Sequence, residues 1–575
     1  MTYLNALTLH PNNPIEQKKY LQLSFKKTMT KLKYFIKCNE LDIRKESMTY
    51  VFEHIKPTII KLISHFVKTE DKVLIESNKW DDYNFRKKLF ECLVELGDKS
   101  IMIWVFFHFN YYYLSNLDLQ RKILLENIEI FSKYFPKSLY FTDINDLYNT
   151  CSKCNPLFSI SYQNKNNREI LENYSLLLRK ICPDLNYIAP HCNNSNSNNT
   201  NNKQNVNGNG KIKVAFFSEF LTMDSSVLRD RLGIISQLPK NKFDVYYMSF
   251  MKPESITGYI CKTFYNMNKS SYIQVPENIK DARNFIANQK FDIIVYCELG
   301  MLLRPLYLSY SRLAKVQITT WGHSETSGIN TIDYFVSSKY FEIEESKVQN
   351  QYSEKIHLMN SLSTYYYPPT KILLPPNQTF KPRKDFGLDD TMNVYGCIQS
   401  SFKISVEFEK MLNGILKGDP KARILMSLNK PFCRSQVARI FNLLGENDFK
   451  RLLFYPSLDI TSYMNLIKLS DVILDPYPFG GCNTSFEAFD YNIPVVSMPT
   501  KYLNGRFTFG MYKKMGFVDM IADTSQNYID IAVKTGTDKK FKESIKEKIN
   551  NSKHLLFQEK EAIQEWSSFL ESTIS

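Results

Sequence analysis

The chain has 575 residues, 43% of them hydrophobic, enough for about three or four domains with buried cores. Its formal net charge is +14, but the lysines are scattered rather than clustered, which argues against a nucleic-acid-binding scaffold. No signal-peptide pattern opens the chain, and no run approaches the about 18 apolar residues of a membrane span. Eleven irregularly spaced cysteines favour reduced thiols, so we expect a cytoplasmic protein without a membrane span.

Residues 1–190 are expected to form an all-helical N-terminal domain. Apolar side chains recur there at three- and four-residue spacing, and glycine is almost absent. The most apolar run, residues 101–113, includes His108 and Asn110 and therefore predicts a buried helix rather than a membrane span. No clear 34-residue repeat is visible, so degenerate tetratricopeptide repeats and a non-repeat helical domain both stay open.

A group of cysteines and a polar tract end this region. Cys151 and Cys154 have a spacing that zinc ligands use, but Cys182 and the later His191-Cys192 pair do not supply a matching second half, so buried thiols are the default interpretation. Residues 191–210 are rich in asparagine and cannot bury apolar surface, which predicts a disordered linker. The helical domain is therefore expected to be separable from everything that follows.

From residue 211 onwards, short apolar runs alternate with helical patterns, as in doubly wound α/β domains. We expect one Rossmann-like half-domain over residues 211–375 and a second over residues 376–545. Residues 546–575 predict a C-terminal helix that crosses back onto the first half. The expected strands lie within residues 213–220, 242–250, 291–299, 315–321, 332–338, 355–361, 393–399, 422–428, 451–457, 471–476 and 493–499.

Residues 471–499 form the most informative segment, because they combine a strand, a glycine turn, a helix start and a second strand. Gly480 and Gly481 let the backbone turn sharply and approach a ligand closely. A helix that starts after the carboxyl end of a parallel strand offers free N–H groups and a positive dipole end. This arrangement suits a diphosphate.

Polar side chains follow the glycines at the expected helix start. Asn483, Thr484 and Ser485 are the expected N-cap residues. Glu487 lies one turn further on, where its carboxylate could accept hydrogen bonds from both hydroxyls of a ribose. The alternative is that Glu487 only complements the helix dipole.

Residues 475–487 resemble the nucleotide-sugar site of the O-GlcNAc transferase-like (SPINDLY-type) glycosyltransferases, whose bacterial members read DP-aromatic-x-FGG-x-NTS-aromatic-E. The resemblance continues through residues 495–517 and extends more loosely to bacterial cytoplasmic protein N-glucosyltransferases. It implies a GT-B fold and a nucleotide-sugar donor. The residues expected to bind the nucleotide and diphosphate here are Gly481, Cys482, Asn483, Thr484 and Glu487.

Two further motifs resemble donor-binding segments of this family. Gln399 to Lys403 (QSSFK) is similar to a QS-x-FK segment whose lysine contacts the diphosphate, so Lys403 would stabilise the departing nucleoside diphosphate as a catalytic residue, with Gln399 beside it. A solvated lysine at a strand end is the alternative. Tyr463 stands where the family places an aromatic residue or histidine against the base; plain helix packing is the alternative. Arg506 is an unassigned candidate for phosphate binding.

The sugar or acceptor side is expected to involve two loops. Gly322 and His323 belong to WGHSETSG, which resembles a family loop that faces the donor sugar, and His323 is either a general base or a hydrogen-bonding positioner. Glu298 and Gly300 resemble an SLGM segment of the N-glucosyltransferases. This chain departs from the family's SDF-x-x-H segment, because Met223 or Asp224 stands in place of the histidine.

The resemblance implies an inverting glycosyltransferase that moves a sugar, GlcNAc from UDP-GlcNAc in the first instance, onto protein Ser or Thr. The donor binds without a cofactor or metal ion, because the chain has no Asp-x-Asp pair. A UDP-glucose- or GDP-fucose-dependent protein glycosyltransferase and a catalytically silent nucleotide-sugar-binding protein are the alternatives. The expected partners are the donor and a protein acceptor recruited by the helical domain, with no nucleic acid.

Overall fold

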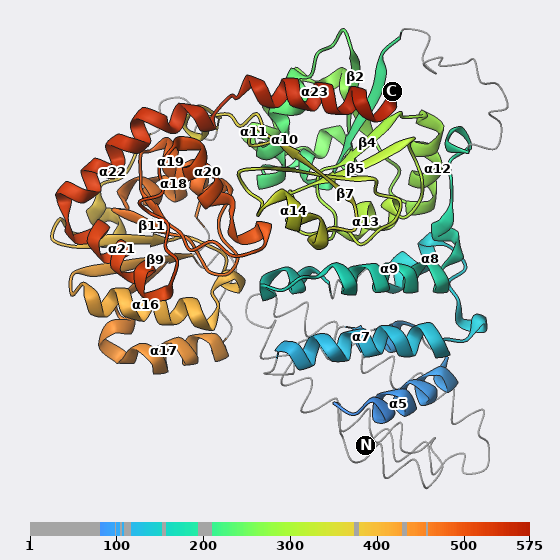
Figure 1. Ribbon diagram of the computed structural model, residues 1–575, viewed down its shortest axis with the longest axis horizontal. Helices are drawn as coiled ribbons and strands as arrows, with labels where there is room; N and C mark the ends of the chain where they lie inside the picture. The colour runs from blue at the N-terminus through green and yellow to red at the C-terminus, as the bar shows by residue number, and fades with distance from the viewer. Residues whose placement is uncertain are drawn as a thin grey trace.

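The computed structural model describes residues 81–575 apart from residues 98, 104–105, 108–116, 152–156, 194–209, 373–378, 428–433 and 456–457. A helical region and two α/β domains make up this part of the chain (Figure 1). Most of the polar tract, Cys154 and much of the apolar run at 101–113 lie outside the described residues. Among the helices that are described, none is long and apolar enough to cross a bilayer.

The first α/β domain contains a seven-stranded sheet in the order β3-β2-β1-β4-β5-β6-β7, and all its neighbours pair in parallel. The order reverses between β1 and β4, as in doubly wound domains. β4 is buried along its length. The strands are β1 (Ile212–Phe217), β2 (Phe243–Ser249), β3 (Tyr272–Gln274), β4 (Ile293–Tyr296), β5 (Val316–Thr320), β6 (Tyr334–Ser338) and β7 (Lys355–Met359). The helices are α10 (Ser226–Gln237), α11 (Tyr259–Met267), α12 (Ile279–Gln289), α13 (Leu303–Ser309) and α14 (Glu345–Val348).

The second α/β domain has a five-stranded parallel sheet in the order β10-β9-β8-β11-β12. Its strands are β8 (Asn393–Cys397), β9 (Ala422–Ser427), β10 (Leu452–Tyr455), β11 (Val472–Leu474) and β12 (Val495–Val496). Its helices are α16 (Val406–Gly418), α17 (Arg434–Phe449), α18 (Ile460–Leu469), α19 (Asn483–Asp490), α20 (Phe507–Met515), α21 (Ser525–Thr537) and α22 (Lys539–Ser552), and the short α15 (Pro369–Ile372) precedes them. The predicted fold class, two doubly wound domains after a helical region, is confirmed. Every expected strand is present, and only the three-residue β3 was missed, since it is half-exposed and has no apolar run.

The last helix, α23 (Lys560–Ile574), leaves the second domain and lies on the first (Figure 1). The indole N–H of Trp566 donates to the carbonyl of Ser363 at 3.0 Å, and the ring of Phe569 stacks on His357 at 3.9 Å. Trp566 is fully buried. The helix therefore ties the two domains together at the end opposite to the helical region.

The helical region lies against the other side of the first domain, with α9, α7 and α5 in successive layers (Figure 1). Its helices are α5 (Tyr83–Leu96), α6 (Lys99–Ile103), α7 (Leu117–Tyr134), α8 (Ile144–Cys151) and α9 (Arg168–Ile181). Buried residues of α9, such as Leu177 and Ile181, share one apolar core with Phe217 and Tyr296 of the first sheet. The expectation that this region is separable is wrong, because the apolar stripe of α9 is buried against the α/β domain.

The cysteines of the helical region are thiols in apolar surroundings. Cys151 and Cys182 are buried, and burial raises the pKa of each to about 12. Over the described residues, which leave out Cys154, no group of three or more His, Cys, Asp or Glu side chains is placed to hold a metal ion.

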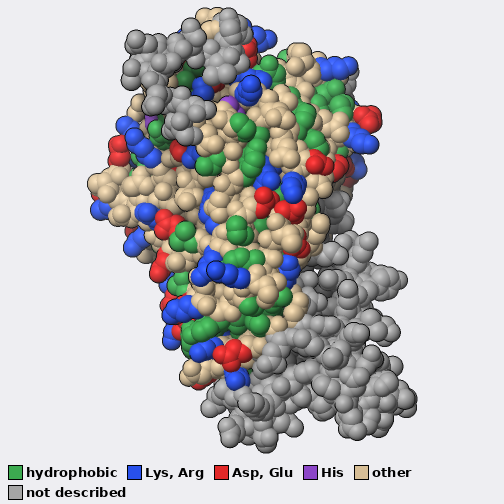
Figure 2. Space-filling model, turned by 90° about the vertical axis from the view of Figure 1, so that its right-hand side faces the viewer, with side chains coloured by type: hydrophobic (Ala, Val, Ile, Leu, Met, Phe, Trp, Pro, Cys, Tyr) green, Lys and Arg blue, Asp and Glu red, His purple; other side chains and the backbone are tan. Residues whose placement is uncertain are grey.

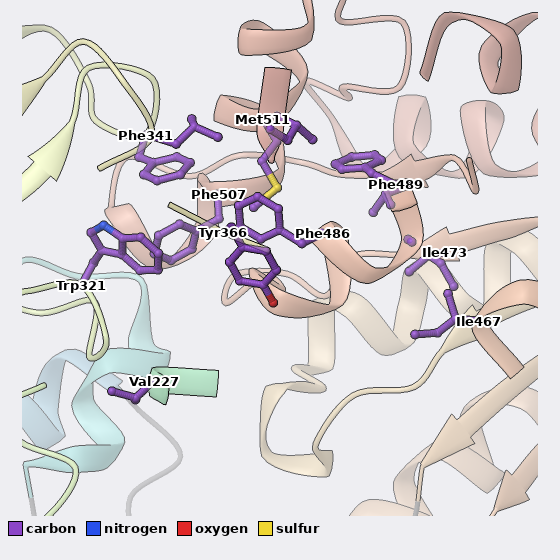
Figure 3. Packing of buried hydrophobic residues seen from close by; sticks show 14 of the residues in the cluster. Val227, Trp321, Phe341, Tyr366, Ile467, Ile473, Phe486, Phe489, Phe507 and Met511 are labelled. Carbon is purple, nitrogen blue, oxygen red and sulfur yellow. The ribbon is translucent and has the colours of Figure 1, made fainter. Parts of the chain in front are cut away.

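Aromatic side chains join the two α/β domains at their interface (Figure 3). Tyr366 of the first domain stacks on Phe486 of α19, with ring centres 4.0 Å apart and planes at 8°. Trp321 and Phe341 of the first domain both pack on Phe507 of α20, at 5.3 and 5.0 Å. These contacts fix how the domains face each other, and therefore the shape of the site between them.

Candidate active site

The loop between β11 and α19 is held by a buried carboxylate. Asp475 accepts hydrogen bonds from the Gly481 N–H at 2.5 Å and from the Ser497 hydroxyl at 2.7 Å. A Cβ atom on Gly480 would lie 3.0 Å from the Asp475 carboxylate oxygens, so glycine allows the close approach. The loop thus presents its backbone at the carboxyl ends of β8 and β11, the edge where open α/β sheets bind ligands.

The start of α19 differs from the expected capping pattern. The N-cap is Cys482, which forms no side-chain cap, so the prediction that Asn483, Thr484 and Ser485 cap the helix is wrong. They occupy the first helical turn, and their side chains bond elsewhere; Ser485, for example, lies 2.7 Å from the Thr508 hydroxyl. The first N–H groups of the helix thus have no side-chain cap, which suits an anionic ligand.

Two of the predicted diphosphate residues meet this helix start. The Gln399 side-chain amide donates to the Thr484 hydroxyl at 2.9 Å, and the Lys403 ammonium donates to the Gly480 carbonyl at 2.8 Å. The ammonium also lies 4.8 Å from the centre of the Phe479 ring. Burial lowers the pKa of Lys403 to about 8, while nearby Asp475 opposes the shift. The structure therefore brings these predicted residues together, and their roles stay predictions.

The predicted ribose acceptor is held by the protein itself. Glu487 is 1% exposed, forms an ion pair with Arg229 of α10, and accepts a hydrogen bond from the Tyr463 hydroxyl at 2.6 Å. The Tyr463 ring is thus fixed beside α19 through its hydroxyl. Sequence patterns gave no signal for Arg229, because it comes from the other domain.

Asn483 is likewise bonded to residues of the first α/β domain. Its amide donates to the Asp230 carboxylate at 3.2 Å, and its carbonyl oxygen accepts from the Tyr366 hydroxyl at 2.6 Å. Burial raises the pKa of Asp230 to about 6. Consecutive residues of α10, Arg229 and Asp230, therefore contact two of the three α19 side chains that the sequence assigned to the nucleotide.

The structure brings together the two loops that are predicted to lie on the sugar or acceptor side. A Cβ atom on Gly300, whose φ is +105°, would lie 2.9 Å from the His323 ring, and one on Gly322 would lie 2.3 Å from the Cys297 carbonyl. The two glycines therefore let the WGHSETSG loop pack directly on residues 297–300. Burial lowers the pKa of His323 to about 4, so the imidazole is neutral at pH 7.

Glu298 lies in the same contact but is not paired. It is 1% exposed, and neither carboxyl oxygen forms a well-aligned hydrogen bond in the part of the chain that is described, although Ser218 lies near enough to favour the charged form. Burial raises its pKa to about 8, so the carboxyl group keeps its proton at neutral pH. A protonated carboxyl can donate a hydrogen bond, which suits a positioning role on this side of the cleft.

A short segment of the helical region, η4 (Phe158–Gln163), covers this site and was not predicted. Phe158 stacks on His323 at 5.7 Å, and Tyr162 stacks on Phe479 at 4.5 Å. The Asn504 amide of the second domain donates to the Ser161 carbonyl at 2.6 Å. The segment therefore contacts both α/β domains and lies next to both predicted catalytic side chains.

Two residues that the sequence left open have structural contacts. The guanidinium of Arg506 donates to the carbonyls of Phe341 at 2.7 Å, Thr500 at 2.9 Å and Glu342 at 3.2 Å, so it ties the domains together rather than facing the loop before α19. Asp224 accepts a hydrogen bond from the N–H of Cys261 in α11 at 2.8 Å. Its carboxylate is thus committed to a helix start and does not replace the missing histidine.

Comparisons with known proteins agree with the resemblance. Residues 368–565 match the family model of glycosyl transferase family 41. The probable UDP-N-acetylglucosamine--peptide N-acetylglucosaminyltransferase SPINDLY of Solanum lycopersicum is 24% identical over 263 residues, 45% of this chain and 27% of that protein. A Caenorhabditis elegans UDP-N-acetylglucosamine--peptide N-acetylglucosaminyltransferase is 27% identical over 165 residues, 29% of this chain and 14% of that protein. The chain thus spans about a quarter or less of these relatives' length.

A solved structure shows the same fold over almost the whole chain. A mutant of the Thermobaculum terrenum O-GlcNAc transferase superposes with a TM-score of 0.60 at 18% identity, covering 92% of this chain and 94% of that one. The expected GT-B architecture is thereby confirmed, together with the resemblance to O-GlcNAc transferase-like glycosyltransferases.

Proposed function

We propose that this chain, whose residues 368–565 match glycosyl transferase family 41, is an inverting glycosyltransferase that moves GlcNAc from UDP-GlcNAc onto protein Ser or Thr without a metal ion. The observation that carries the proposal is the placement of Lys403, Gln399 and Thr484 around the glycine turn before α19. The names of the SPINDLY and nematode relatives support UDP-GlcNAc as the donor and a peptide as the acceptor.

The main electrostatic demand of the reaction is the charge on the departing UDP. As the acceptor hydroxyl attacks the anomeric carbon, the bond to the diphosphate breaks and negative charge collects on its oxygens. Lys403 and the N–H groups at the start of α19 would stabilise that charge. A cation and a helix terminus at this position would take the place of a divalent metal ion.

The sugar side supplies the groups for the acceptor. His323 has an unprotonated ring nitrogen at neutral pH and would accept the hydroxyl proton, and the protonated Glu298 would donate a hydrogen bond to the sugar or acceptor. The acceptor protein would be recruited by the helical region, because its η4 segment lies over this end of the site. A cytoplasmic location is part of the proposal and is supported by the unpaired cysteines among the described residues.

The test is a donor screen on the full chain with UDP-GlcNAc, UDP-glucose and GDP-fucose, in the presence of a metal chelator. The expected result is release of UDP from UDP-GlcNAc and detection of GlcNAc on acceptor peptides by mass spectrometry. NMR should show that the anomeric configuration of the transferred sugar is inverted. If only UDP-glucose or only GDP-fucose is turned over, that nucleotide sugar is the donor in place of UDP-GlcNAc. Nucleotide binding without turnover would favour a catalytically silent binding protein, a candidate that the substitution at Met223 motivates.

A further inference from the structure

A cavity lies between the helical region and the first α/β domain. Its volume is about 670 Å³, within the usual range of small-molecule sites. Its walls come from the end of α9, from residues 186–192, and from the residues just before β5 and β6. Because the strands are parallel, this is the amino-terminal edge of the sheet, whereas His323 follows the carboxyl end of β5. The cavity is therefore separate from the proposed transferase site.

Basic side chains dominate the charge around the cavity. Arg312 forms two hydrogen bonds with the Asp333 carboxylate, at 2.5 and 3.0 Å, and Lys315 pairs with Asp292 at 2.9 Å. Arg179 also lines the cavity, but it pairs with no carboxylate in the described part of the chain. Its hydrogen bonds go to three uncharged oxygens of Leu185, Asn186 and Tyr310 and to one hydroxyl. One positive charge at the cavity is thus left uncompensated.

Two buried polar atoms of the lining residues lack a partner. The Nε of Arg179 and the Nδ1 of His191 are buried and form no hydrogen bond within the described residues. The other ring nitrogen of His191 lies 3.2 Å from the carbonyl of Phe291. Both atoms are closed off from the cavity, so they are unsatisfied groups within its wall and not contacts for a ligand.

We propose that this cavity binds a small phosphorylated metabolite, with its phosphate group against Arg179 and Lys315. The phosphate would compensate the charge of the Arg179 guanidinium, whose terminal N–H groups already donate to four protein oxygens, and would accept a hydrogen bond from the Lys315 ammonium. The rest of the ligand would lie against Tyr187 and Ile188, a large apolar side chain that is 47% exposed at the cavity. The cavity has room for a group of sugar size attached to the phosphate.

The experiment is isothermal titration calorimetry of the full chain with glucose 6-phosphate at low ionic strength, with glucose as the uncharged comparison. Asn330 is exposed on the cavity wall and has no hydrogen bond described, so its substitution changes the charge with little effect on the fold. Asn330→Asp adds a negative charge beside the phosphate position, and Asn330→Gln is the matched neutral control. Lys403→Ala reports on binding at the transferase site.

The expected result is saturable binding of one glucose 6-phosphate and none of glucose, weakened about tenfold or more by Asn330→Asp and unchanged by Asn330→Gln or Lys403→Ala. Equal affinity in Asn330→Asp, or no saturable binding to the unmodified chain, would overturn the proposal. Loss of binding in Lys403→Ala would place the phosphate in the transferase site instead, and would overturn it as well.

Discussion

Replacing Lys403 by alanine tests the proposed diphosphate site most directly. The ammonium is held 2.8 Å from the Gly480 carbonyl, at the turn that leads into α19. A charge-assisted hydrogen bond to a partly buried phosphate contributes about 1.5–3 kcal/mol, so Lys403→Ala should weaken UDP binding by roughly 10- to 150-fold. Turnover should fall further, by about 100-fold or more, because the charge on UDP is largest in the transition state.

The assay is calorimetry with UDP and GDP on the unmodified chain and on the variant, with a chelator present. Lys410→Ala is the matched control, since Lys410 is exposed on the neighbouring α16 and should leave UDP affinity unchanged. An unmodified chain and a Lys403→Ala variant with the same UDP affinity would refute the assignment of Lys403. If the unmodified chain binds neither nucleotide, the glycosyltransferase proposal loses its central support.

Three further outcomes follow from the same geometry. Because the pKa of Lys403 is lowered to about 8 from 10.5, its positive charge is present below that pH and lost above it, so UDP affinity should fall above about pH 8. Lys403→Arg should remove this fall, and the same pH profile in Lys403→Arg as in the unmodified chain would contradict this cause. Glu487→Gln leaves Arg229 buried without its carboxylate and should lower the free energy of unfolding by about 3–5 kcal/mol, seen as a lower Tm. Adding Arg229→Met should restore part of this loss, whereas strictly additive effects of the two substitutions would argue against the ion pair. Tyr162→Ala removes a ring packed on Phe479 and should lower the free energy of unfolding by about 3 kcal/mol or more, with a parallel loss of transferase activity. Tyr162→Phe should keep both the stability and the activity, and full activity of the alanine variant would show that η4 does not shape the site.

The fold was largely predictable because its main signals are local. Each strand of a buried parallel sheet is a short apolar run, and these runs alternate with helical patterns over residues 211–499. The strand β3 was not predicted because it has three residues and no buried side chain. The start of α19 was predicted correctly, but its capping residues were not, because Asn483 and Thr484 bond to side chains that are distant in sequence.

The site was predictable only where its residues follow a strand in the same domain. Gln399, Lys403 and Thr484 come after β8 and β11, which are neighbours in the sheet, so their proximity follows from the topology. The ion pair of Arg229 with Glu487 spans 258 positions and joins two domains. No local pattern encodes such a contact, because it depends on how the domains pack.

Charged side chains of both signs are mixed on one face of the molecule. On the face in Figure 2, Lys and Arg side chains are interspersed with Asp and Glu rather than gathered together.

The helical region and the cleft form one structural unit, although an asparagine-rich tract separates them in sequence. Phe158 and Tyr162 pack on His323 and Phe479, which lie in different α/β domains. The carboxylate of Glu325, in the same loop as His323, accepts a hydrogen bond from Asn167 at 3.0 Å. Removing the helical region would therefore expose the predicted sugar side of the proposed transferase site to water and remove contacts from the loop that holds His323, so the proposed site is complete only with residues that precede the tract.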